Sequence, residues 1–242
     1  MISITEQELK DIDLLKFNDG KDPYDDTSLK NAFNRGIDYY RSKVKEYNFV
    51  GHNDVLDLMC GFGRWSIFLS EYNKTVTAID WNEGAINIGQ GMSDYLGIKN
   101  ITFNAGDVLT TKQFPDSSFD AVWIWNALIY VERGPCLKEV YRVLRPGGKV
   151  LVGAMNSSGR LVEKIIYGLS GFSSRHRSHL RQAASALWNG SFYDGRPNYS
   201  TYRSAKKVFE RFGFEVTNIE IAGTNAFGIF PRNLNIILKK RI

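Results

Sequence analysis

Cysteine, histidine and long apolar runs are all scarce in this 242-residue sequence. The two cysteines, Cys60 and Cys136, are too few for a disulfide framework or for a zinc site built from four thiolates. No apolar run approaches the roughly 20 residues that a membrane-spanning helix needs, and the acidic N-terminal region does not resemble a secretory leader. We therefore expect a cytoplasmic, reducing location, with no metal and no membrane partner.

Charged residues are distributed unevenly along the chain, which carries a formal net charge of +5. Residues 1–28 hold eight acidic residues against three lysines, whereas residues 157–211 hold ten basic residues against three acidic ones. A basic segment attracts anionic partners, such as a nucleic acid or a phosphorylated small molecule. A solvated surface with no partner has the same composition, so charge alone leaves both alternatives open.

Strand-like and helix-like patterns alternate through most of the chain, which is typical of a parallel sheet covered by helices on both faces. Apolar residues at helical spacing predict one N-terminal helix from Ser28 to about Tyr47. The expected strands lie at residues 55–60, 75–80, 101–108, 119–126, 149–155, 214–221 and 234–240. The link between the last two strands is too short for a parallel crossover, so we expect them to be antiparallel.

The predicted fold class is α/β, with a single doubly wound, mostly parallel sheet of seven strands and an antiparallel last strand. No linker or internal repeat divides the chain, so we expect one domain over residues 1–242. The segment after the fifth strand is too long for a simple connection and predicts a helical lid over the sheet. The expected parts are an N-terminal helical cap (1–50), a ligand-binding core (51–156), the lid (157–200) and a C-terminal helix with two strands (201–242).

The turn after the first strand is rich in glycine. Gly61 and Gly63 let the backbone approach a ligand closely, at the carboxyl end of a strand, where open α/β sheets bind ligands. Asp80 ends the second strand 17 residues after Gly63, where a carboxylate accepts hydrogen bonds from both hydroxyls of a ribose. Each feature alone also fits an ordinary turn or helix cap.

Further residues of this kind follow at the next strand ends. Trp81 offers an apolar face to a planar base, and ordinary core packing is the alternative. Asp107 is positioned to accept the amine of adenine while Val108 packs on the ring. Asp57, Asp80 and Asp107 would then face one crevice from three successive strands, which favours a nucleotide site over coincidence.

Over roughly residues 55–155, the chain resembles the class I S-adenosylmethionine-dependent methyltransferases. Residues 55–64, VLDLMCGFGR, are similar to the family's first motif, residues 76–80, VTAID, to its ribose-binding acid, and residues 106–108, GDV, to its adenine motif. Residues 119–123, FDAVW, and 139–152, EVYRVLRPGGKVLV, are similar to its fourth strand and to the helix and turn that lead into its fifth. The resemblance implies a Rossmann-like fold and S-adenosyl-L-methionine as the cofactor.

The resemblance also implies roles for individual residues. Asp57 would orient the glycine turn, backbone atoms in that turn and after the fourth strand would meet the methionine part, and the remaining residues would hold the adenosine. The expected cofactor-binding residues are Asp57, Cys60, Gly61, Gly63, Asp80, Trp81, Asp107, Val108 and Asn126. The family usually has glycine where this chain has Met59, so we expect that side chain to point away from the cofactor.

The implied reaction moves a methyl group by in-line displacement to an oxygen or nitrogen of a small-molecule acceptor. Because the methyl group is already activated, placement and exclusion of water matter more than acid–base catalysis, and the catalytic residues stay unknown. Candidate bases are Tyr130, His176 and His179; candidate aromatic faces for the sulfonium are Trp125, Tyr130 and Tyr24. Candidate residues for an acceptor with an anionic group are Tyr24, Arg175 and Arg177.

Three alternatives remain. The basic residues 157–211 would suit an RNA methyltransferase. Residues 125–128 lack the sequence motif that is typical of enzymes that methylate N6 of adenine. Cys136 lies in a segment with helical spacing, so a place in a helix explains it better than a role as the nucleophile that attacks cytosine. An NAD-dependent dehydrogenase would need a third glycine, where Ser66 stands. A non-catalytic nucleotide-binding protein is the third alternative.

Overall fold

The computed structural model describes residues 4–20, 24–110, 113–128, 130–156, 202–224 and 231–241. Seven strands form one sheet in the order β3-β2-β1-β4-β5-β7-β6. They are β1 (Asp54–Leu58), β2 (Thr75–Asp80), β3 (Ile101–Ala105), β4 (Phe119–Trp125), β5 (Leu144–Asn156), β6 (Phe214–Thr224) and β7 (Pro231–Lys240). Strand β1 pairs in parallel with both β2 and β4, β2 pairs in parallel with β3, and β6 and β7 are antiparallel. The predicted seven-stranded α/β fold and its antiparallel last pair are confirmed.

The chain forms two compact units, which are described separately. Unit 1 comprises Met1–Ile124 and Arg142–Lys149, and unit 2 comprises Trp125–Tyr141 and Val150–Ile242. The predicted division of the chain into a cap, a core, a lid and a C-terminal part stays a prediction.

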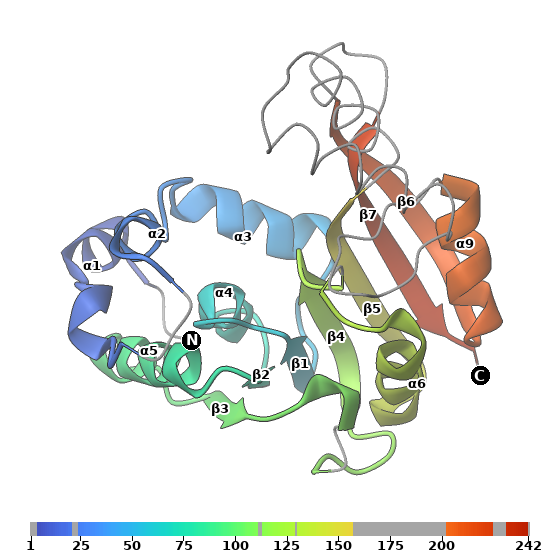
Figure 1. The fold of residues 1–242 in the computed structure, drawn as a ribbon, viewed down its shortest axis with the longest axis horizontal. Helices are drawn as coiled ribbons and strands as arrows, with labels where there is room; N and C mark the ends of the chain where they lie inside the picture. The colour runs from blue at the N-terminus through green and yellow to red at the C-terminus, as the bar shows by residue number, and fades with distance from the viewer. Residues whose placement is uncertain are drawn as a thin grey trace, which may run out of the picture. The chain divides into compact units, whose positions relative to one another are not determined.

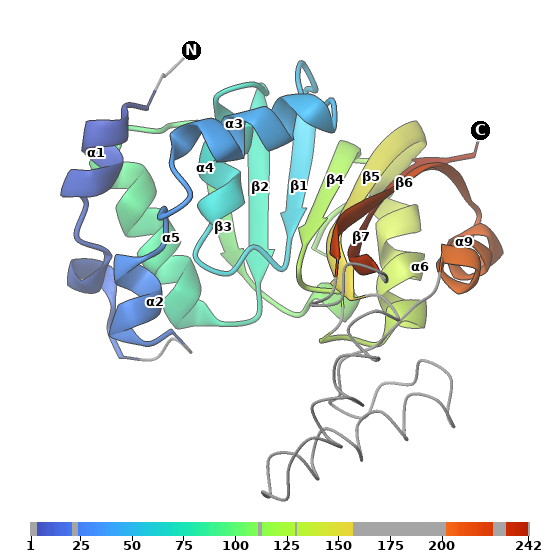
Figure 2. The same cartoon turned by 90° about the horizontal axis from the view of Figure 1, so that it is seen from above.

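Unit 1 winds strands and helices alternately through β1, α4 (Arg64–Ser70), β2, α5 (Glu83–Tyr95) and β3 (Figure 1). Right-handed crossovers that advance in one direction place both helices on the same face of the sheet, as Figure 2 shows. The other helices of this unit are α1 (Glu6–Asp11), η1 (Leu14–Phe17), α2 (Asp26–Lys30), α3 (Ile37–Glu46) and η2 (Val108–Thr110). Helix α3 packs on α4, where the ring of Tyr40 stacks on that of Phe68 at 4.7 Å between centroids.

The prediction of one N-terminal helix from Ser28 to Tyr47 is wrong, because the chain turns between α2 and α3. Gly36 stands at the N-cap of α3 with a φ of 74°, a conformation that a right-handed helix cannot contain. The apolar spacing continues on both sides of this turn, so periodicity alone does not detect the break.

Strand β5 begins at Leu144, five residues before the predicted start at Lys149. The backbone N–H groups of Ser117 and Ser118 donate to the carbonyls of Arg142 and Val143, at 3.0 and 2.8 Å. These bonds hold the last two residues of α6, and the extended conformation begins directly after them.

Unit 2 contains α6 (Arg133–Val143) up to Tyr141, the C-terminal helix α9 (Tyr202–Arg211) and the antiparallel pair β6–β7. Gly213 follows α9 with a φ of 90°, a conformation typical of a glycine that ends a helix, and a Cβ there would collide with the ring of Tyr141. The predicted lid, residues 157–200, lies outside the described residues. In the part of the chain that the structure describes, no helix is long and apolar enough to cross a membrane.

Candidate functional site

The turn between β1 and α4 uses its own backbone N–H groups internally. The N–H of Cys60 donates to the carbonyl of Ile79 at 3.0 Å, and that of Gly63 donates to the carbonyl of Cys60 at 3.0 Å. The N–H of Gly61 donates to Oδ2 of Asp80 at 2.8 Å. These three N–H groups are therefore committed within the protein. The carbonyl of Gly61 accepts a hydrogen bond of 3.3 Å from the Cys60 thiol and keeps a second acceptor position. Such a turn suits a cationic ligand group better than a pyrophosphate, which needs N–H donors.

Glycine is required at two positions of this turn. Gly61 and Gly63 have φ values of 57° and 76°, and a Cβ at Gly63 would collide with the ring of Phe103. A Cβ at Gly61 would collide with the hydroxyl of Tyr24. Met59, where the family usually has glycine, also has a positive φ of 60°, so the backbone keeps a conformation that favours glycine despite the side chain.

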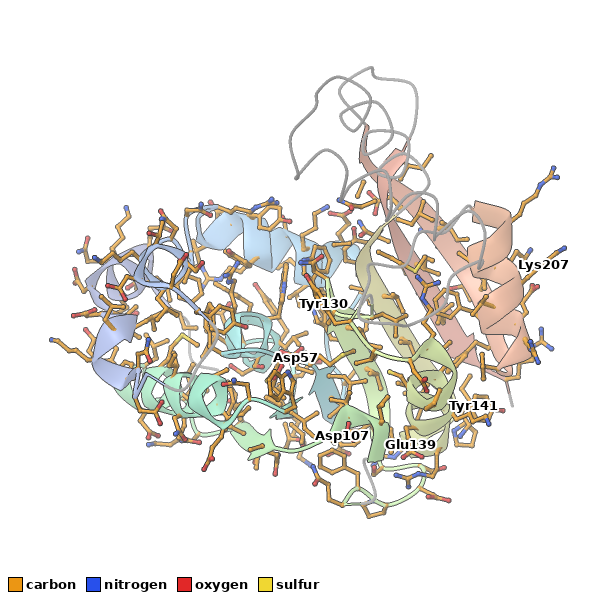
Figure 3. All side chains as sticks on the ribbon, in the orientation of Figure 1. Asp57, Asp107, Tyr130, Glu139, Tyr141 and Lys207 are labelled. Carbon is orange, nitrogen blue, oxygen red and sulfur yellow. The ribbon has the colours of Figure 1, made fainter. Side chains whose placement is uncertain are left out.

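Asp57 is buried in β1 beside helix α4 (Figure 3). Its Oδ2 accepts a hydrogen bond of 2.6 Å from the hydroxyl of Ser66 in that helix. Burial raises the pKa of Asp57 to about 7; the hydrogen bond from Ser66 opposes this shift, and the negative charge of Asp80 adds to it. The same burial, with both acids nearby, raises the pKa of the Cys60 thiol, so this thiol keeps its proton at neutral pH. Asp57 is thus placed to fix the start of α4 against β1.

Asp80 ends β2, and only 8 % of its surface is exposed. Its Oδ1 accepts the N–H of Asn82 at 3.1 Å, in addition to the bond from Gly61 to Oδ2. A carboxylate offers about four acceptor positions, so two remain for the hydroxyls of a ribose. Trp81 is 73 % exposed, which excludes the alternative that it packs in the core.

The third strand end differs in detail from the prediction, because β3 ends at Ala105 and Val108 begins the short helix η2. The N–H of Gly106 donates to the carbonyl of Asp80 at 2.9 Å, which ties this segment to the end of β2. Asp107 is exposed, and its Oδ1 accepts the N–H of Leu109 at 2.9 Å. Val108 is buried.

Unit 1 therefore brings together the carboxyl ends of β1, β2 and β3. Strand β1 lies between β2 and β4, at the point where the strand order reverses and where open α/β sheets bind ligands. The predicted site residues that come from this unit are Tyr24, Asp57, Cys60, Gly61, Gly63, Asp80, Trp81, Asp107 and Val108.

Other predicted residues belong to unit 2 or are not described. Asn126 follows β4 with a φ of 54°, and its N–H donates to the carbonyl of Gly153 at 2.9 Å. A Cβ on Gly153 would collide with the indole of Trp125, so this ring packs on β5. Tyr130 is 63 % exposed (Figure 3). Outside the described residues lie Arg175, Arg177, His176 and His179.

The sequence-based prediction omits two residues that shape the site, Ser66 and Phe103. Ser66 stands where a dinucleotide fingerprint would place its third glycine, and its hydroxyl instead binds Asp57. Phe103 fills the space beside both Gly63 and Gly89. The position of Ser66 in the glycine motif was a usable signal, whereas the contact of Phe103 depends on the tertiary fold. Among the residues that the structure describes, no three or more His, Cys, Asp or Glu side chains form a group that could hold a metal ion.

Comparisons with known proteins agree with this geometry. Residues 55–148 match the family described as "Methyltransferase domain". A demethylmenaquinone methyltransferase of Anoxybacillus flavithermus is 31 % identical over 134 residues, which cover 54 % of this chain and 56 % of that protein. One from Leptospira interrogans is 37 % identical over 110 residues, or 44 % of each chain. The chain thus spans about half the length of the curated relatives it matches.

The crystal structure of a protein described as a SAM-dependent methyltransferase, from Methanosarcina mazei, has the same fold. It aligns with a TM-score of 0.62 and 23 % identity, over 82 % of this chain and 97 % of that one. The fold of the chain is thus that of an α/β domain with a mostly parallel seven-stranded sheet. Residues 55–148 therefore resemble a methyltransferase domain, as the motifs of this segment predict, and the chain has the fold of that solved methyltransferase.

Proposed function

We propose that this protein transfers a methyl group from S-adenosyl-L-methionine to an oxygen or nitrogen atom of a small-molecule acceptor. The observation that carries the proposal is the carboxylate of Asp80, which lies at the end of β2 and is hydrogen-bonded to the glycine turn that follows β1. When bound, S-adenosylmethionine supplies a methyl group that its positively charged sulfur already activates.

Different residues of unit 1 bind different parts of this donor. The two remaining acceptor positions of Asp80 take the ribose hydroxyls, and the exposed face of Trp81 stacks on the adenine. Asp107 accepts the adenine amine, and Val108 packs against the ring. The carbonyl of Gly61 accepts a hydrogen bond from the ammonium group of the methionine part. Asp57 acts as a positioning residue, because its bond to Ser66 fixes the glycine turn between β1 and α4.

Asn126, in unit 2, is proposed to contact the methionine part through its backbone. Tyr130, His176 and His179 stay candidate bases, while Arg175 and Arg177 are proposed to bind an anionic group of the acceptor. The chain's contribution to the reaction is then alignment and exclusion of water. We also propose a cytoplasmic location.

The names of the relatives support a small-molecule acceptor, so a demethylmenaquinone with a shortened side chain is the first compound to test. RNA is the second candidate, because helix α9 exposes a mostly basic face. In Figure 3, Lys207 points away from this helix. The exposed basic residues of α9 are Arg203, Lys206, Lys207 and Arg211.

The test is transfer of a radiolabelled methyl group from S-adenosylmethionine to these two acceptors, with Asp80→Ala as the inactive control. Label on an oxygen or nitrogen atom of a small molecule supports the proposal, and label in RNA supports the second candidate. Label on the ring carbon of the quinone supports a small-molecule acceptor and overturns the assignment to oxygen or nitrogen. Binding of S-adenosylhomocysteine with no transfer to any acceptor supports a non-catalytic protein. Binding of NAD instead of S-adenosylhomocysteine overturns the assignment.

A further inference from the structure

Tyr24 lies directly over the glycine turn in unit 1. Its ring meets the ring of Phe62 edge-on, with 5.0 Å between centroids and an angle of 85°. A Cβ on Gly61 would collide with the hydroxyl of Tyr24. The absence of a side chain at Gly61 therefore makes room for this hydroxyl, which lies within reach of any ligand group that contacts the turn.

The N-terminal segment that carries Tyr24 is fixed to the helices of unit 1. Glu71 is buried; its Oε1 accepts the N–H of Ile4 at 3.0 Å, and its Oε2 accepts the guanidinium of Arg41 at 2.7 Å. Arg41 also donates to the carbonyl of Ile4 at 2.6 Å. Closer to Tyr24, the ring of Phe17 occupies the space over Gly91 in α5. These contacts hold the segment on the surface from which Tyr24 reaches the turn.

The charges around the turn suit the two ends of an amino acid differently. Asp80 and the carbonyl of Gly61 favour an ammonium and repel a carboxylate. The N–H groups of Cys60, Gly61 and Gly63 are already bonded within the protein, so they do not offset that repulsion.

Donor and cationic groups lie instead around Phe62. The hydroxyl of Tyr24 is a hydrogen-bond donor, and the guanidinium of Arg64 lies 5.1 Å from the centroid of the Phe62 ring. Arg64 also interacts with the hydroxyl of Tyr40: burial raises the pKa of Tyr40, and the charge and hydrogen bond of Arg64 oppose that shift. The guanidinium is thus held beside the ring that Tyr24 touches.

We propose that the hydroxyl of Tyr24 donates a hydrogen bond to the carboxylate of the methionine part of the bound donor, and that Arg64 supplies positive charge beside it. This assignment rests on the proposed function. It assigns Tyr24 to the binding of the donor rather than of the acceptor. The amino acid then lies with its ammonium toward Asp80 and the carbonyl of Gly61. Tyr24 then contributes to selecting an intact S-adenosyl amino acid over a nucleoside that lacks one.

The test compares two ligands in calorimetric titrations. S-adenosylhomocysteine carries the amino acid, and 5′-methylthioadenosine lacks it. Tyr24→Phe should weaken S-adenosylhomocysteine about tenfold, because it removes a bond to a charged group, and should leave 5′-methylthioadenosine within about twofold. Tyr95→Phe is the matched control, since Tyr95 is exposed at the end of α5, and it should change neither affinity.

A chemically modified ligand, from which the carboxylate has been removed, gives a second, independent measurement on the wild-type protein. S-adenosylhomocysteine without its carboxylate should bind wild type about tenfold more weakly than the parent compound, and Tyr24→Phe should cause no further loss. An unchanged affinity of Tyr24→Phe for S-adenosylhomocysteine, or an equal loss for both nucleosides, would overturn the assignment. Failure of the wild type to bind S-adenosylhomocysteine at all would instead reject the proposed function.

Discussion

The carboxylate of Asp80 accepts a hydrogen bond from the backbone N–H of Gly61 at 2.8 Å, although 19 residues separate the two in sequence. This bond joins the end of β2 to the turn after β1, so the acid and the glycine turn form one arrangement. The carboxylate has two tasks in this account: it holds the turn, and it faces the ribose of the donor. Changes to either residue should therefore affect both binding and stability.

Replacement of Asp80 tests the ribose contact. Asp80→Ala should weaken S-adenosylhomocysteine binding by about 2 kcal/mol or more, because ribose hydroxyls lose a charge-assisted partner. Asp94→Ala is the control, since Asp94 is exposed on α5. Calorimetry on protein whose circular dichroism is that of a folded chain gives the affinity. An unchanged affinity would remove Asp80 from the site.

Replacement of Trp81 tests the adenine contact separately from folding. Trp81→Ala should leave the melting temperature nearly unchanged, because 73 % of the side chain is exposed. The affinity for S-adenosylhomocysteine should fall about tenfold, as expected for the loss of one stacked base. Tyr95→Ala removes another exposed aromatic side chain, on α5, and should leave the affinity as it is. If both variants bind like wild type, Trp81 does not stack on the base.

The contact between Gly61 and Tyr24 gives a stability prediction with a built-in rescue. Gly61→Ala should lower the free energy of unfolding by more than the roughly 1–2 kcal/mol that a positive φ costs, because the new methyl group also meets the Tyr24 hydroxyl. Tyr24→Phe in the same chain removes that hydroxyl and should recover part of the loss. Urea unfolding of the two single variants and the double variant measures the coupling; strictly additive effects would contradict the contact.

Asp57 predicts a pH dependence of stability. Its pKa is raised from 3.8 to about 7 in the folded protein, so the folded state binds this proton more tightly than the unfolded state does. The stability that Asp57 contributes is therefore present at low pH and is lost as the pH rises toward 7. Relative to Asp57→Asn, the wild-type free energy of unfolding should fall by about 2 kcal/mol between pH 5 and pH 8.

Chemical denaturation of wild type and Asp57→Asn at several pH values measures this difference, and Asp94→Asn is the exposed control. A constant difference between wild type and Asp57→Asn across the range would show that Asp57 titrates at its ordinary pH.

The sequence predicts much of this fold because burial sets a clear pattern. Strand β2 occupies the residues predicted for it. The break at Gly36 escapes prediction because the apolar stripe of α2 continues in phase into α3. A turn over residues 31–36, which ends at Gly36 with its positive φ, separates the two helices, and periodicity does not report φ.

The site divides in the same way. Asp80 and the glycine turn can each be recognised from a short stretch of sequence, because each directly follows the end of a predicted strand. The contacts of Tyr24 with Gly61 and of Phe103 with Gly63 join residues about 40 positions apart, and no spacing rule in one sequence reports such pairs. The exposure of Trp81, which favours a ligand contact over core packing, also depends on the whole fold.

The most direct test of the central claim is a pair of calorimetric titrations of the wild-type protein, one with S-adenosylhomocysteine and one with NAD. The account predicts saturable binding of one S-adenosylhomocysteine per chain and no measurable binding of NAD, because the turn after β1 commits its N–H groups to Ile79, Asp80 and Cys60. Binding of NAD, or the absence of any binding of S-adenosylhomocysteine to the folded protein, would contradict it.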